Sequence, residues 1–381
     1  MTDAAVAGRI EREYRLGPAS LRRRYGSVCG DRVGYQGESP AGDGILVRAY
    51  RADMPLPPAV RGSGTGPVTD WLQGRAATLA WLAACGYPAP RVVTTRSGDP
   101  VGVAGAWLTW ATSFVPGRGL APGGGGGGLL GAALGRLHAL GAPWESSGSL
   151  ERGRGASGAG VAALAVRGPG AYRAGLASRG VRAPGLASWH PATAIPAALR
   201  RLDAVAALLP GEWWPLHEQF RRTLLAVRRA AAALPEAVVH GDAWPGNAVV
   251  TPGGEVMLID WEDGGLGLPV VDLGQCLLEC HLDAGLPVSR PEASHIEPDP
   301  GRIAAVLDGY TRWRRVADAE LEILAEGIRF CAACVGAIHF ERALIDGVHG
   351  PAMDARLGRL RNRITVSQAV ADLAVRHLTA R

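Results

Sequence analysis

The sequence predicts an α+β protein of two lobes, a small strand-rich N-lobe and a larger, mainly helical C-lobe. The chain has 381 residues, more than one compact core usually holds. Its first part carries mostly strand patterns, and the part after a run of six glycines at residues 123–128 carries mostly helical ones. We therefore place the lobe boundary near Gly117, with an N-lobe at residues 1–116 and a C-lobe at residues 117–381.

The N-lobe pattern contains strands around one helix. Residues 44–51, "GILVRAYR", read as a strand, and the glycine-rich residues 34–44 before them read as a flexible approach. Residues 71–85 carry apolar side chains at helical spacing and precede a glycine. Two further strands are expected at residues 91–95 and 105–117.

The C-lobe begins with the glycine run, which we interpret as a flexible connection. A leucine-rich helix follows, with His138 as a packing residue at its end. Residues 146–190 are rich in Gly, Ser and Arg, which is typical of a flexible insertion. Helical patterns return at residues 196–234 and fill the tail at residues 300–381.

Composition excludes several classes of protein. The net charge is +5, and all 40 basic residues are arginine; without lysine there is no P-loop. The arginines are scattered and not interleaved with aromatic residues, so no nucleic-acid partner is expected. No apolar run is long enough to span a bilayer. The N-terminus carries charges where a signal peptide needs apolar residues, so we expect a cytoplasmic protein without membrane contact.

Two cysteine pairs invite a metal hypothesis. They occur as Cys276-x3-Cys280-His281 and Cys331-x2-Cys334, both in apolar, helix-like text. Zinc ligands usually lie on polar loops, whereas a buried cysteine behaves as a small hydrophobic residue. This context favours core cysteines over a metal site, and a cytoplasmic protein is expected to lack disulfides.

The segment "VVHGDAWPGNAVV" at residues 238–250 places polar residues between two β-branched runs. With the next apolar run it predicts a hairpin. If the turn is centred between Gly253 and Gly254, Asn247 faces Asp260 across the hairpin. Directly opposed residues have Cβ atoms about 5 Å apart.

An amide oxygen and a carboxylate at that spacing suit Mg²⁺. Asp242 precedes the hairpin within reach of the same place. Kinase catalytic loops use the same logic: one Asp accepts the proton of the attacking hydroxyl, while an Asn and a second Asp hold the metal. The pattern therefore predicts Asp242 as a proton acceptor and Asn247 and Asp260 as metal ligands.

His240 has two readings. It either supports the loop by hydrogen bonding, which we favour, or acts as a general base. A metal hydrolase built on His240 and Asp242 is disfavoured, because no further His or carboxylate stands at ligand spacing.

The motifs "HGDAWPGN" and "LIDWEDGGLGLPVVDLG" resemble the aminoglycoside phosphotransferase and choline kinase superfamily. Residues 79–93, 113–120 and 134–140 resemble the helix-to-strand segment, the interlobe hinge and the first C-lobe helix of that family. The resemblance implies a bilobal protein-kinase-like fold that uses ATP and Mg²⁺ to phosphorylate a hydroxyl group.

Applied to single residues, the resemblance implies that Asp242 is the catalytic base and that Asn247 and Asp260 are Mg²⁺ ligands. Backbone groups near Ser113 and Val115 would contact adenine.

Arg48 stands where the family has a strand cation that binds the α- and β-phosphates, and arginine suits phosphate. Arg75 stands where a helix normally supplies the Glu partner of that cation, so this partner is missing or lies elsewhere. Asp272 would be a structural acid beneath the loop, together with His240.

The predicted function is ATP- and Mg-dependent transfer of the γ-phosphoryl group to a hydroxyl of a small, amino-bearing molecule. An aminoglycoside, an amino sugar or a homoserine-like amino alcohol would fit. Residues 241–310 hold 12 acidic residues and two arginines, an excess that complements a cationic substrate or serves only metal binding and solvation. Glu262, Glu279 and Asp283 are the expected substrate contacts. The alternative is a nucleotide-binding pseudokinase with a regulatory role, suggested by the absent lysine and Glu partner.

Overall fold

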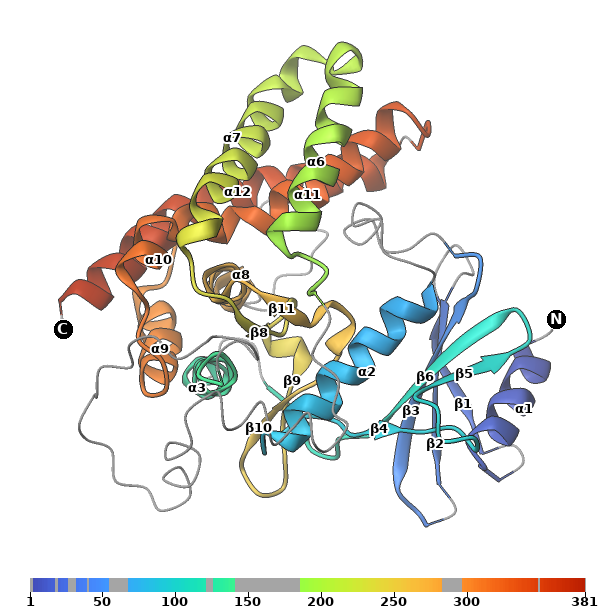
Figure 1. Ribbon diagram of the computed structural model, residues 1–381. Helices are drawn as coiled ribbons and strands as arrows, with labels where there is room; N and C mark the ends of the chain where they lie inside the picture. Colours follow the sequence, from blue (N-terminus) through green and yellow to red (C-terminus); the bar gives the residue numbers. More distant parts are fainter. Residues whose placement is uncertain are drawn as a thin grey trace.

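An antiparallel sheet forms the N-terminal part of the protein, and a group of helices forms most of the rest (Figure 1). The computed structural model describes residues 3–17, 20–26, 32–39, 41–54, 68–120, 126–140, 186–282, 297–348 and 350–380. None of the helices in these ranges is long and apolar enough to cross a membrane.

The N-terminal sheet has six strands in the order β1-β2-β3-β6-β4, with β5 also paired to β6. All of its pairings are antiparallel. Its strands are β1 (Arg22–Gly26), β2 (Arg32–Glu38), β3 (Gly44–Arg51), β4 (Val92–Val93), β5 (Val101–Ala104) and β6 (Trp107–Ser113). Two helices accompany it, α1 (Asp3–Glu13) and α2 (Val68–Ala84).

Strand β3 divides its side chains between the two faces of this sheet. Ile45, Val47 and Ala49 belong to a small core that α1 completes. Because side chains alternate along a strand, Arg48 and Tyr50 lie on the opposite face, and Tyr50 joins the larger core with residues of α2. This alternation directs Arg48 toward the C-terminal part of the molecule.

The chain passes from this sheet to a second one between Ser113 and Arg118. Strand β7 (Arg118–Gly119) pairs with β9 (Ala248–Val250), which also pairs with β10 (Val256–Leu258). This passage contains the predicted lobe boundary near Gly117. That residues 1–116 and 117–381 are separate domains stays a prediction.

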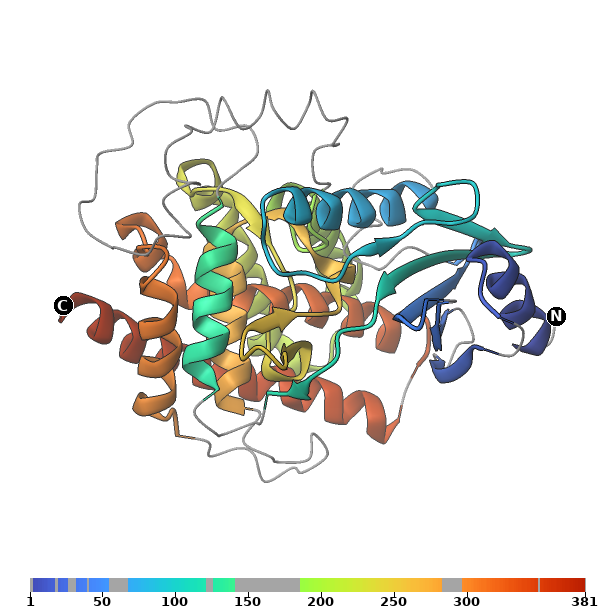
Figure 2. The same ribbon diagram turned by 90° about the horizontal axis from the view of Figure 1, so that it is seen from below.

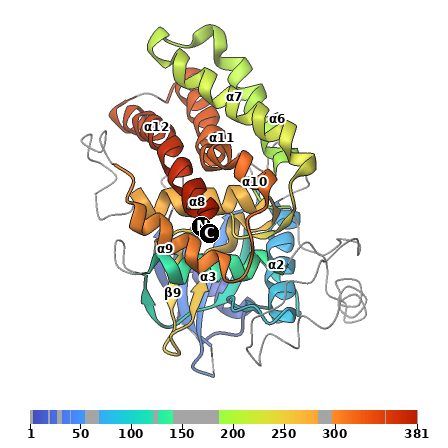
Figure 3. The same ribbon diagram turned by 90° about the vertical axis from the view of Figure 1, so that its left-hand side faces the viewer.

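Helix α11 (Leu324–Leu344) is the central helix of the C-terminal part. It packs against α6 (Pro191–Val205), α7 (Trp214–Ala230), α8 (Pro269–Leu282) and α12 (Pro351–Thr379). Figure 3 shows that α6, α7, α11 and α12 gather at one end of the molecule, away from the N-terminal sheet. The remaining described elements of this part include β8 (Ala237–Val239), β11 (Gly265–Gly267), which pairs with β8, and α10 (Asp318–Glu322).

Helices α3 (Gly127–His138) and α9 (Pro300–Thr311) pack backbone to backbone, side by side in Figure 2 (green and orange). A Cβ atom at Gly131 or Gly135 would collide with the main-chain oxygens of Val306 and Tyr310. Glycine therefore permits the close approach, which brings the end of α3 next to Tyr310.

Several sequence predictions are confirmed. The strand predicted at residues 44–51 is β3, and the helix predicted at residues 71–85 is α2. Helix α2 ends before Gly86, whose φ of +70° places it in the left-handed region. The tail at residues 300–381 is mostly helical, as predicted.

Other predictions are wrong or lie outside the described residues. Residues 34–44 are not a flexible approach, because β2 occupies residues 32–38 and places Val33 and Tyr35 in the smaller core. The glycine run is not wholly a connection, since α3 begins at Gly127. Of the insertion predicted at residues 146–190, residues 146–185 lie outside the described part of the chain.

Candidate active site

The loop after β8 turns sharply at Gly241, which carries Asp242 into the site. Gly241 has φ +79°, and a Cβ atom there would lie 2.5 Å from the main-chain oxygen of Asp263. Only glycine meets both conditions without strain. The backbone then passes through a short 3-10 turn, Pro245–Asn247, into β9.

Two side-chain amides hold the carboxylate of Asp242. Asn247 Nδ2 donates to Oδ2 at 2.7 Å, and Gln275 Nε2 donates to Oδ1 at 2.8 Å. Burial, followed by the charges of Asp263 and Asp260, raises the pKa of Asp242 to about 7. A carboxylate fixed in this way, with a pKa near neutrality, suits a proton acceptor.

His240 supports the loop. Its Nε2 donates to the Ile259 carbonyl at 2.8 Å, while its Nδ1 accepts the amide of Asp242 at 3.3 Å. Burial lowers the pKa of this imidazole, and the ring packs edge-on against Trp261. Both ring nitrogens thus form hydrogen bonds within the fold. This arrangement supports the loop and leaves neither nitrogen available to act as a general base.

Asp272 lies beneath the loop and accepts three hydrogen bonds. Its carboxylate receives the amides of His240 at 2.7 Å and Gly241 at 3.0 Å, and His138 Nε2 at 3.1 Å. Burial alone would raise the pKa of Asp272, but the hydrogen bonds from His138 and His240 bring it below its usual value. Asp272 therefore fixes the backbone of the loop, in the position the sequence predicted.

His138 connects this acid to the helices behind it. Its Nδ1 lies 2.8 Å from the Tyr310 hydroxyl, which accepts a hydrogen bond from Arg314 at 2.9 Å. Since the Asp272 carboxylate only accepts, His138 donates from Nε2 and accepts at Nδ1 from Tyr310. Arg314 also pairs with buried Glu320 at 2.9 Å. His138 is therefore more than the predicted packing residue.

The predicted register of the hairpin is wrong by one residue. Val256 pairs with Val250 and Leu258 with Ala248, so Asn247 lies opposite Ile259, whose amide donates to its carbonyl at 2.9 Å. The reason is the turn: its loop has an odd number of residues, closed by a hydrogen bond from Thr251 to Glu255 at 2.9 Å.

Asp260 reaches the site through its backbone conformation instead. It follows β10 with φ +65° and ψ +60°, a left-handed conformation that Asp tolerates better than most residues. Asp260 lies close enough to raise the pKa of Asp242. Asn247 Oδ1 takes no hydrogen bond from the part of the chain that the structure describes. An amide oxygen and a half-exposed carboxylate therefore flank Asp242, a donor set that suits a hard divalent cation.

Arg48 finds its acidic partner on the turn that carries Asp260. Its Nε lies 2.9 Å from Glu262 Oε1, and its Nη2 lies 2.9 Å from Asp260 Oδ1. Both Arg48 and Glu262 are mostly buried. Arg32 also approaches Glu262, at 3.4 Å. The structure thus places Glu262 against Arg48; that Glu262 contacts a substrate stays a prediction.

Arg75 has a different task. It is fully buried, and its guanidinium donates to the carbonyls of Gly264 and Leu186 and, at 3.3 Å, to Ser188 Oγ. Burial lowers the pKa of Arg75 to about 10, opposed by the nearby Asp263, so the side chain keeps its charge at neutral pH. Arg75 therefore ties helix α2 to the turn after Asp260 and does not replace the partner of Arg48.

The expected adenine contacts lie on the passage out of β6. The amide of Ser113 donates to Arg91 at 2.8 Å, and its hydroxyl accepts the Arg91 amide at 2.9 Å. Val115 makes no backbone hydrogen bond with any other residue in the described ranges. Of the two, Val115 has backbone groups available for a ligand, whereas the amide of Ser113 is engaged.

The remaining acids are divided. Glu279 lies one turn after Gln275 on α8, contributes to the raised pKa of Asp242, and forms an ion pair with Arg363 of α12. Asp283, the other expected substrate contact, lies outside the described residues.

The cysteines expected in the core are buried there. They are Cys276, Cys280, Cys331 and Cys334. Within the described ranges, no three His, Cys, Asp or Glu side chains form a metal-binding group of their own.

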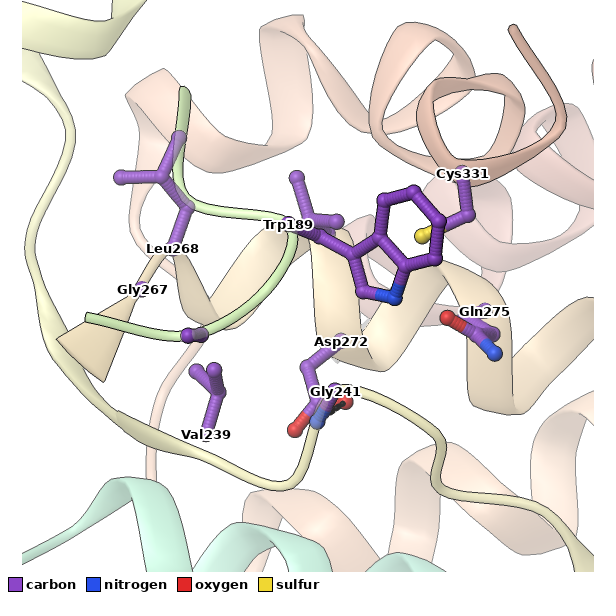
Figure 4. A pocket seen from close by; sticks show the side chains of 10 residues that line it. Trp189, Val239, Gly241, Gly267, Leu268, Asp272, Gln275 and Cys331 are labelled. Atoms are coloured by element: carbon purple, nitrogen blue, oxygen red, sulfur yellow. Dashed lines mark hydrogen bonds between the residues drawn. The ribbon is translucent and has the colours of Figure 1, made fainter. Parts of the chain in front are cut away.

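A small pocket lies beside the loop, between it and helices α8 and α11 (Figure 4). Gln275 and Asp272 line it together with Trp189 and Cys331. Gln275 and the hydrogen bonds of His138 are functional features beyond those predicted from the sequence. Helical spacing was the available signal for Gln275, since it lies one turn beyond Asp272 on the face that meets the loop.

The fold and the site define a phosphotransferase of the protein-kinase-like class. The chain belongs to the phosphotransferase enzyme family, whose sequence profile matches residues 71–318. The predicted superfamily and bilobal α+β fold are therefore confirmed. A comparison with curated proteins gave no match.

Solved structures of several kinases share this fold. The amicoumacin kinase hAmiN, solved with AMP-PNP, Ca²⁺ and Ami, has a TM-score of 0.63 at 15% identity, over 97% of this chain and 94% of that one. A microcompartment-associated aminopropanol kinase has a TM-score of 0.52 at 17% identity, over 99% and 98%. An aminoglycoside phosphotransferase from Alicyclobacillus acidocaldarius has a TM-score of 0.53 at 15% identity, over 95% and 94%. At these identities, the likeness establishes the fold.

Proposed function

We propose that the protein transfers the γ-phosphoryl group of ATP to a hydroxyl of a small, amino-bearing molecule. The observation that carries this proposal is the environment of Asp242. Its carboxylate is held by Asn247 and Gln275, and its pKa is raised to about 7. A base with this pKa accepts a hydroxyl proton near neutral pH, and two fixed hydrogen bonds keep it aligned with the acceptor.

A nucleotide and a divalent cation fit the residues around Asp242. Asn247 and Asp260 would hold Mg²⁺, Arg48 would bind the α- and β-phosphates, and the chain near Ser113 and Val115 would contact adenine. When bound, the metal neutralises charge on the phosphates. The binding of AMP-PNP and Ca²⁺ by the amicoumacin kinase supports this assignment.

An amino-bearing acceptor is supported by the charge of the site. Asp263 and Glu279 lie close enough to Asp242 to raise its pKa, and a cationic group on the substrate would offset this repulsion. The aminopropanol kinase among the similar structures acts on such a molecule by its name. An amino alcohol, an amino sugar or an aminoglycoside meets this requirement.

The pseudokinase alternative loses one of its two motives. It was suggested by the missing acidic partner of the strand cation, and Glu262 lies 2.9 Å from Arg48 in that role. The other argument for a pseudokinase was the absence of lysine. Arg48 carries the same charge as a lysine and offers a forked donor to phosphate.

The test is a screen for acceptor-dependent ADP formation from Mg-ATP with amino alcohols, amino sugars and aminoglycosides. We expect turnover with at least one class, and a kcat lower by about 10²- to 10⁴-fold in Asp242→Asn. Asp318→Asn is the matched control, because Asp318 is an exposed acid that pairs with the equally exposed Arg315. Mg-ATP binding without turnover of any acceptor would contradict the proposal. His138→Ala is unsuitable as a control, since His138 bonds Asp272.

A further inference from the structure

The amide of Gln275 has a fixed orientation beside Asp242. A carboxylate accepts hydrogen bonds, so the Gln275 atom 2.8 Å from Asp242 Oδ1 is the nitrogen. The amide oxygen, Oε1, therefore points away from the carboxylate. The nitrogen end of this amide therefore bonds Asp242, and the oxygen end faces other surroundings.

Oε1 of Gln275 is buried and accepts no hydrogen bond from any residue that the structure describes. A buried acceptor without a donor is costly, and native proteins rarely leave one unused. Most of the other polar groups around the loop are paired, including both ring nitrogens of His240 and both oxygens of Asp272. The unpaired oxygen thus marks a place where a ligand can donate a hydrogen bond.

The pocket beside the loop has the size for such a donor. Gln275 lines it with Trp189 and Cys331, and Figure 4 shows these three side chains gathered around one space. Its volume is about 10 Å³, near the minimum for one water-sized group. It has room for a single ammonium or hydroxyl group and not for a whole substrate.

We propose that Gln275 is a specificity-determining residue that reads a hydrogen-bond donor next to the reacting hydroxyl of the acceptor. The inference rests on the proposed function. Because one amide group contacts both Asp242 and the donor, the donor and the reacting hydroxyl lie on neighbouring carbons of the acceptor, as in a 1,2-amino alcohol or a 1,2-diol. The half-buried indole of Trp189 favours the ammonium form through cation–π attraction.

The experiment compares matched acceptors that differ only in the donor. One set is 1-amino-2-propanol, 1,2-propanediol and 2-propanol; the other is glucosamine, glucose and 2-deoxyglucose. The kcat/KM for each acceptor is measured with Mg-ATP in the wild type, in Gln275→Met and in Gln219→Met. Gln219 is a partly exposed glutamine on α7 that accepts a hydrogen bond from Arg222 at 3.3 Å, so Gln219→Met is the control for the substitution itself.

We expect the wild type to prefer the donor-bearing acceptors over the third member of a set by about tenfold to a hundredfold. In Gln275→Met, which has no unpaired oxygen, the ratio falls to near one, while Gln219→Met keeps the wild-type ratio. The amino and hydroxyl members show which donor is read.

A merely structural Gln275 would lower all rates together and leave the ratio unchanged, which would overturn this inference alone. Equal rates within both sets in the wild type would overturn it too, and would show that Oε1 only holds solvent. No turnover of any acceptor, in these sets or in the wider screen, would instead overturn the proposed function and this inference with it.

Discussion

Arg48 Nε lies 2.9 Å from Glu262 Oε1, so the strand cation takes its acidic partner from the turn that follows Asp260 and not from helix α2. The helix position carries Arg75, which bonds the same turn from the other side. The N-terminal sheet and α2 thus each contribute one arginine, Arg48 and Arg75, that binds the short acidic segment at residues 260–264. The proposed phosphate-binding cation, Arg48, and the proposed metal ligand, Asp260, therefore share a single support.

We predict that Glu262→Gln weakens nucleotide binding. Without its charge, Glu262 holds Arg48 less firmly, while the ion pair of Arg48 with Asp260 stays. The Kd of AMP-PNP with Mg²⁺, measured by calorimetry, should rise on the order of tenfold, together with a lower thermal midpoint. Glu255→Gln is the control, since Glu255 is half-exposed and pairs with Arg136. An unchanged Kd in Glu262→Gln would show that Arg48 needs no anchor.

Removal of the guanidinium of Arg75 should destabilise the protein. Arg75→Met leaves the carbonyls of Gly264 and Leu186 without their donor and Asp263 without its nearest cation. We expect a loss of about 3 kcal/mol in the free energy of unfolding, measured with urea. Arg75→Lys keeps the charge but not the forked donor, and its free energy of unfolding should lie between those of the wild type and Arg75→Met. A Met variant as stable as the wild type would contradict this account of Arg75.

The acid limb of the stability curve should depend on Asp272. Its pKa is lowered in the folded protein, whereas in the unfolded chain it is about 3.9. A depressed carboxyl contributes stability that is fully present above the unfolded pKa and is lost as pH falls through the folded pKa. Urea unfolding between pH 3 and pH 6 should therefore show a decline below about pH 4 that is smaller in Asp272→Asn. If the free energy of unfolding fell equally steeply with pH in the wild type and in Asp272→Asn, this prediction would be wrong.

Two glycines with nearly equal φ angles provide a matched test of the catalytic loop. Gly241 has φ +79° and no room for a Cβ, whereas Gly254 has φ +81° and open space around it. Gly254→Ala should cost only the left-handed strain, about 1–2 kcal/mol. Gly241→Ala should also displace Asp242 and lower kcat by about a hundredfold. Equal kcat values in the two variants would show that the loop tolerates the shift.

Local patterns in the sequence predicted much of this fold. Strand β3 and helix α2 show the hydrophobic spacing of their type, and Asp242, Asn247 and Asp260 lie in motifs of fixed spacing. The hairpin was also predictable, but its register was not. One extra loop residue between Thr251 and Glu255 moves Asn247 opposite Ile259, and the sequence alone does not distinguish a four-residue from a five-residue turn.

Contacts between distant residues were the part that the sequence did not reveal. Glu262 and Arg48 are far apart in the chain, and so are His138 and Asp272. No local spacing relates the members of such pairs, because they meet only after β3 faces the turn and α3 packs on α8. Gln275 is a different case, because its place one helical turn beyond Asp272 was a signal that the sequence contained.

The chain of hydrogen bonds from Asp272 through His138 and Tyr310 to Arg314 has a consequence for the order in which the site is assembled. A ribosome that has reached Leu282 has already made the whole loop with Asp242, and also Asp272 on helix α8 beneath it. The hydroxyl that accompanies His138, on Tyr310, is made later. During synthesis, the loop therefore stays without its full support until α9 has emerged and docked on α3, and we expect catalytic competence to appear late and abruptly.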